Sequence, residues 1–196
     1  MVAPLLAIRA IAAAPLVLDE VSALAFTSRN GVAVFATLSP ERDLPVFTVG
    51  DATAEAARAQ GFRTVRSAGG DLADLATMLI AEAPRHGWLL VPGAREPAGD
   101  LSALASPAIR VRALPVYEAL DTGTAPPEAF DAVLVHSARA ARALRSWGPF
   151  AGQAAVVLSA AVAEALGRGS GLEIHVAATP DESALLEALG KPAHRV

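Results

Sequence analysis

The chain has 196 residues, enough for one large domain or two small ones; 53% of them are hydrophobic, and the formal net charge is −4. This acidic balance argues against nucleic acid or an anionic membrane surface as the main partner. The absence of cysteine excludes disulfides and thiolate metal sites. The first apolar segment, residues 10–18, is too short to span a bilayer and is followed at once by Asp19 and Glu20. We therefore expect a cytoplasmic protein with no membrane contact.

Strand and helix signals then alternate along the first part of the chain. Short apolar runs predict buried strands at residues 23–26, 45–49, 64–65, 88–91 and 109–111. Helices are expected between these strands, at residues 28–35, 51–61, 72–80 and 100–104, with a loop at 92–96. Either Ser28 or Asn30 can cap the first helix, and Gly61 is expected to end the second in a left-handed conformation.

The second part of the chain repeats this series. The matching segments are 24–28 with 131–137, 47–54 with 155–163, and 65–71 with 174–182. The last of them carries a strong helix-start signal, with Thr179 as the cap, Pro180 at the first helical position and Glu182 completing a capping box. Gly190 and Pro192 are expected to end that helix. Two such series predict an α/β fold of two parallel-sheet lobes.

A paired linker is predicted between the lobes. Residues 114–120, which include the only tyrosine of the chain, Tyr117, resemble residues 3–10 in their apolar pattern. The expected divisions are linkers near 7–12 and 114–120, an inserted lobe at 11–114, and a second, discontinuous lobe from 1–10 and 118–196. The second series lacks a counterpart of the strand, helix and strand at 87–117. A strand and helix of roughly 25 residues are therefore expected ahead of Met1.

The chain lacks the motifs of covalent, metal and nucleotide chemistry. No glycine-rich phosphate motif follows a strand, because the glycines of 167–171 follow a helix, and no Gly-x-Ser-x-Gly turn is present. The four histidines are isolated, so no metal site is expected. His136 adjoins Ser137, but neighbouring residues at a strand end point to opposite faces, which argues against a Ser–His pair.

Turns that lead from strand ends into helix starts remain as the candidate site. They lie at Thr27–Ser28, 50–53, Ser137–Ala138, Ser159–Ala160 and Thr179–Pro180. Ligands of open parallel sheets bind beyond the carboxyl ends of the strands, where free backbone N–H groups of helix starts suit carboxylates or phosphates. Any one of these turns is also what an ordinary helix cap looks like. As a set, they predict an anion-binding cleft between two hinged lobes.

In their order along the chain, these motifs resemble the uroporphyrinogen-III synthases. The segments that carry the resemblance are 25–32, 47–54, 115–118, 136–141 and 180–182, within a similarity that extends from about Pro4 to Leu189. It implies two flavodoxin-like lobes joined by a two-stranded linker. It also implies a hydro-lyase that closes hydroxymethylbilane to uroporphyrinogen III, with inversion of the last pyrrole ring and loss of water. The resemblance implies no cofactor, a monomer, and transient contact with hydroxymethylbilane synthase.

Site residues follow from the same resemblance. Tyr117 matches the linker tyrosine of the family, which is proposed to assist departure of the hydroxyl as water. The expected substrate-binding residues are Thr27, Ser28, Asn30, Gly50, Ala52, Thr53, Ser137, Ala138, Ser159, Ala160 and Pro180. The resemblance implies that the backbone amides of Thr27, Ser28, Thr53, Ser137 and Ser159 hold the acetate and propionate groups. Two features depart from the family. The opening strand with an Arg-Pro loop is absent, and Ser159 begins a turn where many members have Gly-x-x-Thr-Ala.

Two other functions stay open from the sequence. A degenerate, synthase-like protein of two lobes would bind an anionic small molecule without catalysis, and the missing strand and helix favour this alternative. A nucleotide-dependent, flavodoxin-like regulator is the third class. On either alternative, Tyr117 is an aromatic residue that packs in the hinge.

Overall fold

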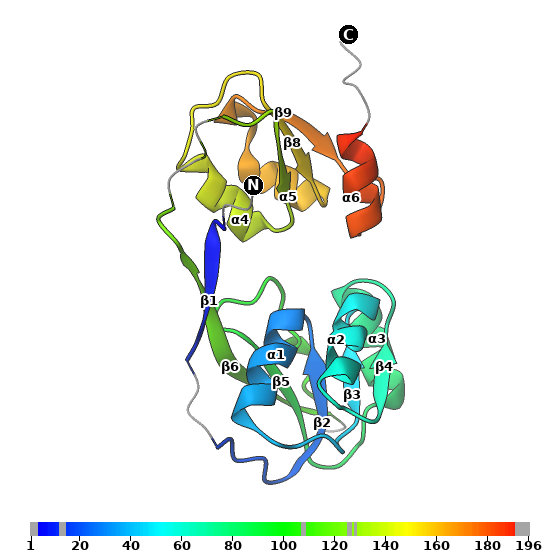
Figure 1. Cartoon of the computed structure of the whole chain (residues 1–196). Helices are drawn as coiled ribbons and strands as arrows, with labels where there is room; N and C mark the ends of the chain where they lie inside the picture. Colours follow the sequence, from blue (N-terminus) through cyan, green and yellow to red (C-terminus); the bar gives the residue numbers. More distant parts are fainter. Residues whose placement is uncertain (1–3, 12–14, 107–108, 125–126, 128, 191–196) are drawn as a thin grey trace. The chain divides into compact units, whose positions relative to one another are not determined.

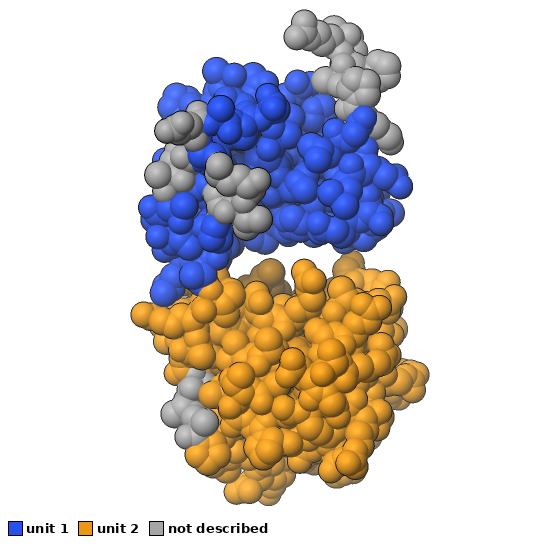
Figure 2. All heavy atoms as spheres, viewed as in Figure 1, with its two compact units in different colours: residues 1–7, 120–196 blue, residues 8–119 orange. Residues whose placement is uncertain are grey.

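The computed structural model describes residues 4–11, 15–106, 109–124, 127 and 129–190 (Figure 1). The chain divides into two compact units, which Figure 2 shows in different colours. We call residues 8–119 the larger unit, and residues 1–7 with 120–196 the smaller unit. The divisions fall within strands β1 (Leu6–Ala10) and β6 (Arg110–Asp121).

The larger unit is built on a six-stranded sheet in the order β1-β6-β5-β2-β3-β4. The strands not yet given are β2 (Val21–Phe26), β3 (Val46–Thr48), β4 (Val65–Ser67) and β5 (Trp88–Ala94). The pairs β2–β3, β2–β5, β3–β4 and β5–β6 are parallel. Strand β1 runs antiparallel to β6, because Ile11 N–H donates to Val116 O at 2.9 Å and Thr122 N–H donates to Leu5 O at 3.1 Å.

Helices cover both faces of this sheet. They are α1 (Arg29–Leu38), α2 (Asp51–Ala59), α3 (Leu72–Glu82) and the short 3-10 helix η1 (Ser102–Leu104). Because side chains alternate along a strand, Leu24 and Phe26 of β2 pack in one buried cluster with α1 and α2. Ala23 and Ala25 pack in another with α3. A parallel sheet buried on both faces explains why its strands are continuous apolar runs in the sequence.

The smaller unit repeats this scheme with a three-stranded parallel sheet in the order β7-β8-β9. Its elements are β7 (Ala132–Val135), α4 (Ala138–Arg145), β8 (Ala154–Val157), α5 (Ala160–Leu166), η2 (Arg168–Ser170), β9 (Glu173–Val176) and α6 (Glu182–Leu189). Val135 packs with Leu144 and Leu166 on the face of α4 and α5, whereas Val156 packs with Leu185 of α6 on the other face.

The prediction of an α/β fold with parallel sheets is confirmed. Gly61 has a φ of 91°, as the left-handed helix end requires, and Gly190 follows α6. The expected helix end at Pro192 lies outside the described residues.

The C-terminal boundary of β5 was predicted too early. Residues 92–94, expected to begin a loop, continue β5, because they pair with β6 through Gly93 and Ala94. The strand expected at 109–111 is the start of β6, which runs without a break through Tyr117. The helix expected at 100–104 is a single 3-10 turn, since Ser106 and Ile109 exchange backbone hydrogen bonds and turn the chain back toward β6.

The predicted start of α6 was also wrong. Its cap is Asp181, not Thr179, and Pro180 lies outside the helix. Asp181 Oδ1 accepts Ala184 N–H at 2.9 Å, while Thr179 Oγ1 donates to the other carboxylate oxygen. A charged carboxylate is the better acceptor at the positive end of a helix, which is why it takes the capping position.

Phe35 of α1 gives a test of this core. It is fully buried, with its ring centroid 5.7 Å from that of Phe26 and 6.2 Å from that of Phe62. We expect Phe35→Ala to lower the free energy of unfolding by about 3–5 kcal/mol, because it leaves a cavity. Urea denaturation followed by circular dichroism measures this. The exposed Val17→Ala should change it by less than about 0.5 kcal/mol, and an equal loss in both variants would contradict the assigned core.

Candidate active site

The carboxyl ends of β2 and β3 lead directly into helices in the larger unit. Ser28 has an extended backbone and caps α1, since its Oγ accepts Gly31 N–H at 3.1 Å. Asn30 is exposed in the first turn of α1 and does not cap it, so only the serine of the two predicted candidates is the cap. Gly31 lets this turn approach β5 closely, because a Cβ there would lie 2.8 Å from Pro92 O.

The start of α2 presents backbone rather than side-chain groups. Gly50 is the cap and, lacking a side chain, makes no side-chain capping bond. Ala52 is exposed, whereas Thr53 is buried in the first turn and its N–H donates to Gly50 O at 3.1 Å. Thr27, at the end of β2, lines a pocket of about 90 Å³ together with Gly93, Arg95 and other residues of the larger unit.

Tyr117 reaches the start of α1 from β6. Its phenol oxygen lies 3.0 Å from Ser28 Oγ, and the side chain is only 7% exposed, packed with Leu38 and Val116. Either hydroxyl can be the donor in this contact; in one arrangement, the serine oxygen accepts Gly31 N–H and the serine donates its own proton to the phenol oxygen. In that arrangement, the phenol proton can be donated to a ligand.

An irregularity in strand pairing sets the position of Tyr117. Gly93 pairs with Pro115, but Ala94 pairs with Tyr117, so Val116 is an extra residue on β6. Bulges of this kind bend a strand and re-aim the side chain that follows. The backbone remains bonded there, because Arg95 N–H donates to Tyr117 O at 2.8 Å.

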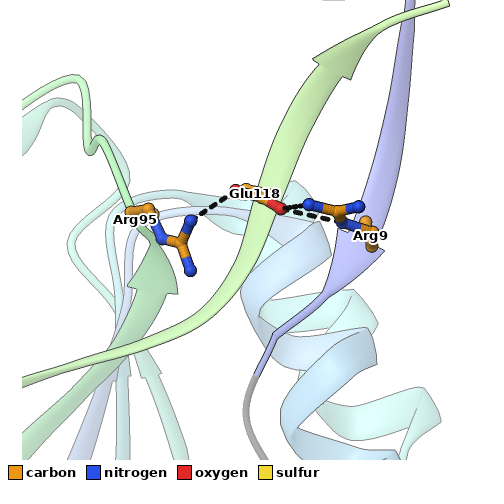
Figure 3. Close-up of polar contacts among 3 residues, drawn as sticks. All are labelled: Arg9, Arg95 and Glu118. Atoms are coloured by element: carbon orange, nitrogen blue, oxygen red, sulfur yellow. Dashed lines mark hydrogen bonds and ion pairs between the residues drawn. The ribbon is translucent and has the colours of Figure 1, made fainter.

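Glu118, which follows Tyr117, is held by two arginines (Figure 3). Arg9 donates to Oε1 from Nε at 2.8 Å and also from Nη2, and Arg95 Nη1 donates to Oε2 at 2.8 Å. The glutamate side chain is 11% exposed, against 63% for Arg9 and 57% for Arg95. The hydrogen bond from Arg9 holds the pKa of the Glu118 carboxyl below its ordinary value of 4.5, against the opposing effect of desolvation.

The smaller unit has the corresponding turns after β7 and β8. Ser137 caps α4, with its Oγ accepting Ala140 N–H at 3.1 Å, and Ala138 is the first helical residue. Ser159 precedes α5 with an extended backbone but makes no side-chain capping bond, and Ala160 is exposed. Since Val135 pairs with Val157, Ser137 and Ser159 lie at the same edge of the sheet.

Charged groups adjoin this edge. His136 Nε2 lies 2.9 Å from Glu182 Oε2 at the start of α6, so His136 does not pair with Ser137. The exposed Pro180 immediately precedes the cap Asp181, whose pKa is lowered first of all by the hydrogen bond from Thr179.

The structure thus brings Tyr117 and Ser28 into direct contact. The other predicted residues lie between a strand end and the first turn of the helix that follows it, each in its own unit. Sequence reasoning missed Arg9, Arg95 and Glu118. Within the described residues, there is no group of three or more His, Asp or Glu that could hold a metal ion. None of the helices described is long and apolar enough to cross a membrane.

The fold and the groups at its strand ends define the class of protein. It is an α/β protein whose helices begin just beyond the carboxyl ends of parallel strands and present backbone amides and hydroxyls there. Residues 1–187 match the family model described as uroporphyrinogen-III synthase HemD. The chain therefore belongs to the uroporphyrinogen-III synthase family, an enzyme family of tetrapyrrole biosynthesis.

Solved structures agree with this fold. Uroporphyrinogen-III synthetase from Helicobacter pylori 26695 is similar with a TM-score of 0.73, at 21% identity, over 94% of this chain and 89% of that chain. A mutant uroporphyrinogen III synthase from the extremely thermophilic bacterium Thermus thermophilus is similar with a TM-score of 0.55, at 18% identity, over 95% and 84% of the two chains. No curated protein matches the chain.

The lowered pKa of Glu118 predicts a dependence of stability on pH. Its charged form is favoured in the folded state, so this stabilisation is present above the ordinary pKa of 4.5 and is lost as the pH falls through the lower folded value. We expect the difference in unfolding free energy between the unsubstituted protein and Glu118→Gln to shrink as the pH falls from about 6 to about 3.

Urea denaturation at several pH values measures this difference. The matched control is Asp43→Asn, which removes the exposed ion pair with Arg63 and should change the unfolding free energy by less than about 1 kcal/mol. A difference between the unsubstituted protein and Glu118→Gln that stays constant over this pH range would contradict the prediction.

Proposed function

We propose that the protein is a uroporphyrinogen-III synthase, a hydro-lyase that closes hydroxymethylbilane to uroporphyrinogen III with inversion of the last pyrrole ring and loss of water. Membership of the HemD family supports this reaction. The observation that carries the proposal is the contact of Tyr117 with Ser28, 3.0 Å apart at the carboxyl edge of the sheet. It pairs a general acid with a group that orients it.

In the proposed step, Tyr117 donates its phenol proton to the leaving hydroxyl of the substrate. The C–O bond breaks, both of its electrons go to oxygen, and the hydroxyl takes the proton and departs as water. Ser28 donates to the phenol oxygen and so stabilises the negative charge that develops there. Inversion of the last ring then takes three bond changes. The ring carbon that already carries the bridging methylene bonds to the methylene that lost the hydroxyl, its old bond to the bridging methylene breaks, and that freed, cationic methylene bonds to the unsubstituted carbon of the same ring. This last carbon loses its proton, which restores the phenol.

Binding of the substrate carboxylates is assigned to the strand-end turns. Backbone N–H groups at the helix starts, at Ser28, Gly50 and Ser137, suit these anions without a basic surface. The proposed contacts in full are Thr27, Ser28, Asn30, Gly50, Ala52 and Thr53 in the larger unit, and Ser137, Ala138, Ser159, Ala160 and Pro180 in the smaller unit. Ser159 contributes a hydroxyl that does not cap α5.

Holding the ends of a linear substrate together lowers the entropic cost of ring closure. In this proposal the protein acts in the cytoplasm as a monomer, without a cofactor, and receives its substrate in transient contact with hydroxymethylbilane synthase.

The deciding experiment supplies hydroxymethylbilane, generated enzymatically, and separates the uroporphyrin isomers after oxidation. We expect the type III isomer to be the main product. If only the type I isomer forms, at the spontaneous rate, the proposal is wrong and binding without catalysis replaces it.

Replacement of the tyrosine tests the general acid. We expect Tyr117→Phe to lower kcat by about 10²-fold and to change KM much less, because the phenol proton acts in the transition state. Steady-state kinetics with isomer analysis measures both constants. An unchanged kcat would leave Tyr117 with a packing role only.

Ser28 is tested separately from its capping role. Ser28→Ala should lower kcat roughly 10-fold, because the charge on the phenol oxygen loses a hydrogen bond, and should also lower the unfolding free energy by about 1 kcal/mol. Ser28→Thr keeps the hydroxyl and should retain most of the turnover. The control is Asp71→Ala, which removes the cap of α3 at a similar cost in stability. If Asp71→Ala lowers kcat as much as Ser28→Ala does, the effect belongs to stability.

A further inference from the structure

The cluster of Arg9, Glu118 and Arg95 takes no part in the chemistry derived so far. We propose that Glu118 is a positioning residue for Tyr117: its carboxylate, held by two arginines, fixes the part of β6 that presents the phenol to Ser28. This inference rests on the proposed function where it concerns turnover. Where it concerns the position of the phenol, it rests on the contacts alone.

Three consecutive residues of β6 are held by separate bonds. Val116 O accepts Ile11 N–H at 2.9 Å, and Tyr117 O accepts Arg95 N–H at 2.8 Å. Glu118 follows with its carboxylate between Arg9 of β1 and Arg95, the residue after β5, as Figure 3 shows. Arg95 therefore holds the tyrosine by its backbone and the glutamate by its side chain.

The bulge at Val116 is the reason such anchoring is needed. The register of β5 and β6 shifts between Gly93 and Ala94, and a bulge of this kind bends the strand and re-aims the side chains that follow, so contacts beyond the ladder are needed to hold that direction. Successive side chains of a strand point to opposite faces, so Glu118 is held on the face opposite to the phenol. Because the two arginines hold the Glu118 carboxylate in place, β6 is kept from rotating about its own axis at this position.

The expected contribution of these ion pairs to stability also favours a positioning role for Glu118. Both arginines are more than half exposed, and ion pairs with exposed partners contribute little to stability. The glutamate is mostly buried, and its desolvation opposes what the pairs contribute. An arrangement in which desolvation offsets part of what the ion pairs contribute, while both carboxylate oxygens are bonded, is suited to selecting one geometry.

The single tyrosine of the chain permits a direct readout. Protein labelled with 3-fluorotyrosine should give one fluorine NMR resonance, which reports the surroundings of the Tyr117 ring. We expect Glu118→Gln to shift or broaden this resonance. The matched control is Glu82→Gln, which removes the ion pair with Arg66 in the same unit and should leave the resonance in place.

Kinetics supply the second readout. Glu118→Gln should lower kcat roughly 10-fold, with KM within about 2-fold of the unsubstituted value, because a displaced phenol still allows binding. In the Tyr117→Phe background, Glu118→Gln should have no further effect on kcat, since the proposed residue acts through the phenol. A merely structural glutamate would lower kcat by the same factor in both backgrounds.

Two results would overturn the inference: a resonance in Glu118→Gln identical to that of the unsubstituted protein, or an equal loss of kcat with and without Tyr117. If Glu118→Gln does not fold, Arg9→Lys replaces it, because lysine keeps the charge but loses the two-nitrogen contact to Oε1. If the unsubstituted protein forms only the type I isomer, the proposed function fails, and the fluorine resonance alone decides whether Glu118 positions the phenol.

Discussion

The parallel pairing of β5 with β6 is the constraint on which the rest of the site depends. It carries β6 from Arg110 to the bulge at Val116 and so brings Tyr117 beyond the carboxyl end of β2, where α1 begins. It also puts Arg95 beside Glu118. Because these contacts come from one register, a slip by a single residue would turn the tyrosine to the other face of the sheet.

Much of this architecture could be predicted from the sequence, because buried parallel strands and capped helix starts have local signals. Ser28, Ser137 and the glycine at position 61 lie in short motifs whose geometry depends on neighbouring residues only. The start of α6 was mispredicted because two capping signals overlap, and Asp181 competes better than Thr179 for the same amide groups.

The arginine cluster has no local signal. Arg9 is more than a hundred positions from Glu118, and Arg95 reaches it only because β5 extends beyond the expected loop start. The clue available from the sequence was the pair of linker segments. In the antiparallel pairing of β1 with β6 that the structure has, Arg9 lies opposite Glu118. The position of Arg95 beside Glu118 depends on the bulge at Val116 in the pairing of β5 with β6, and bulges are properties of two strands together rather than of one.

The close approach of α1 to β5 constrains position 31 to a residue without a side chain. A side chain at Gly31 would meet Pro92 O and push the first turn of α1 away from the sheet. Ser28 belongs to that turn, so it would be drawn off the phenol of Tyr117 at the same time. Mutational tolerance at position 31 is therefore set by the contact of Ser28 with Tyr117 as much as by the core. A glycine inside a helix is poor for helix stability, yet here it keeps the phenol within reach of the serine.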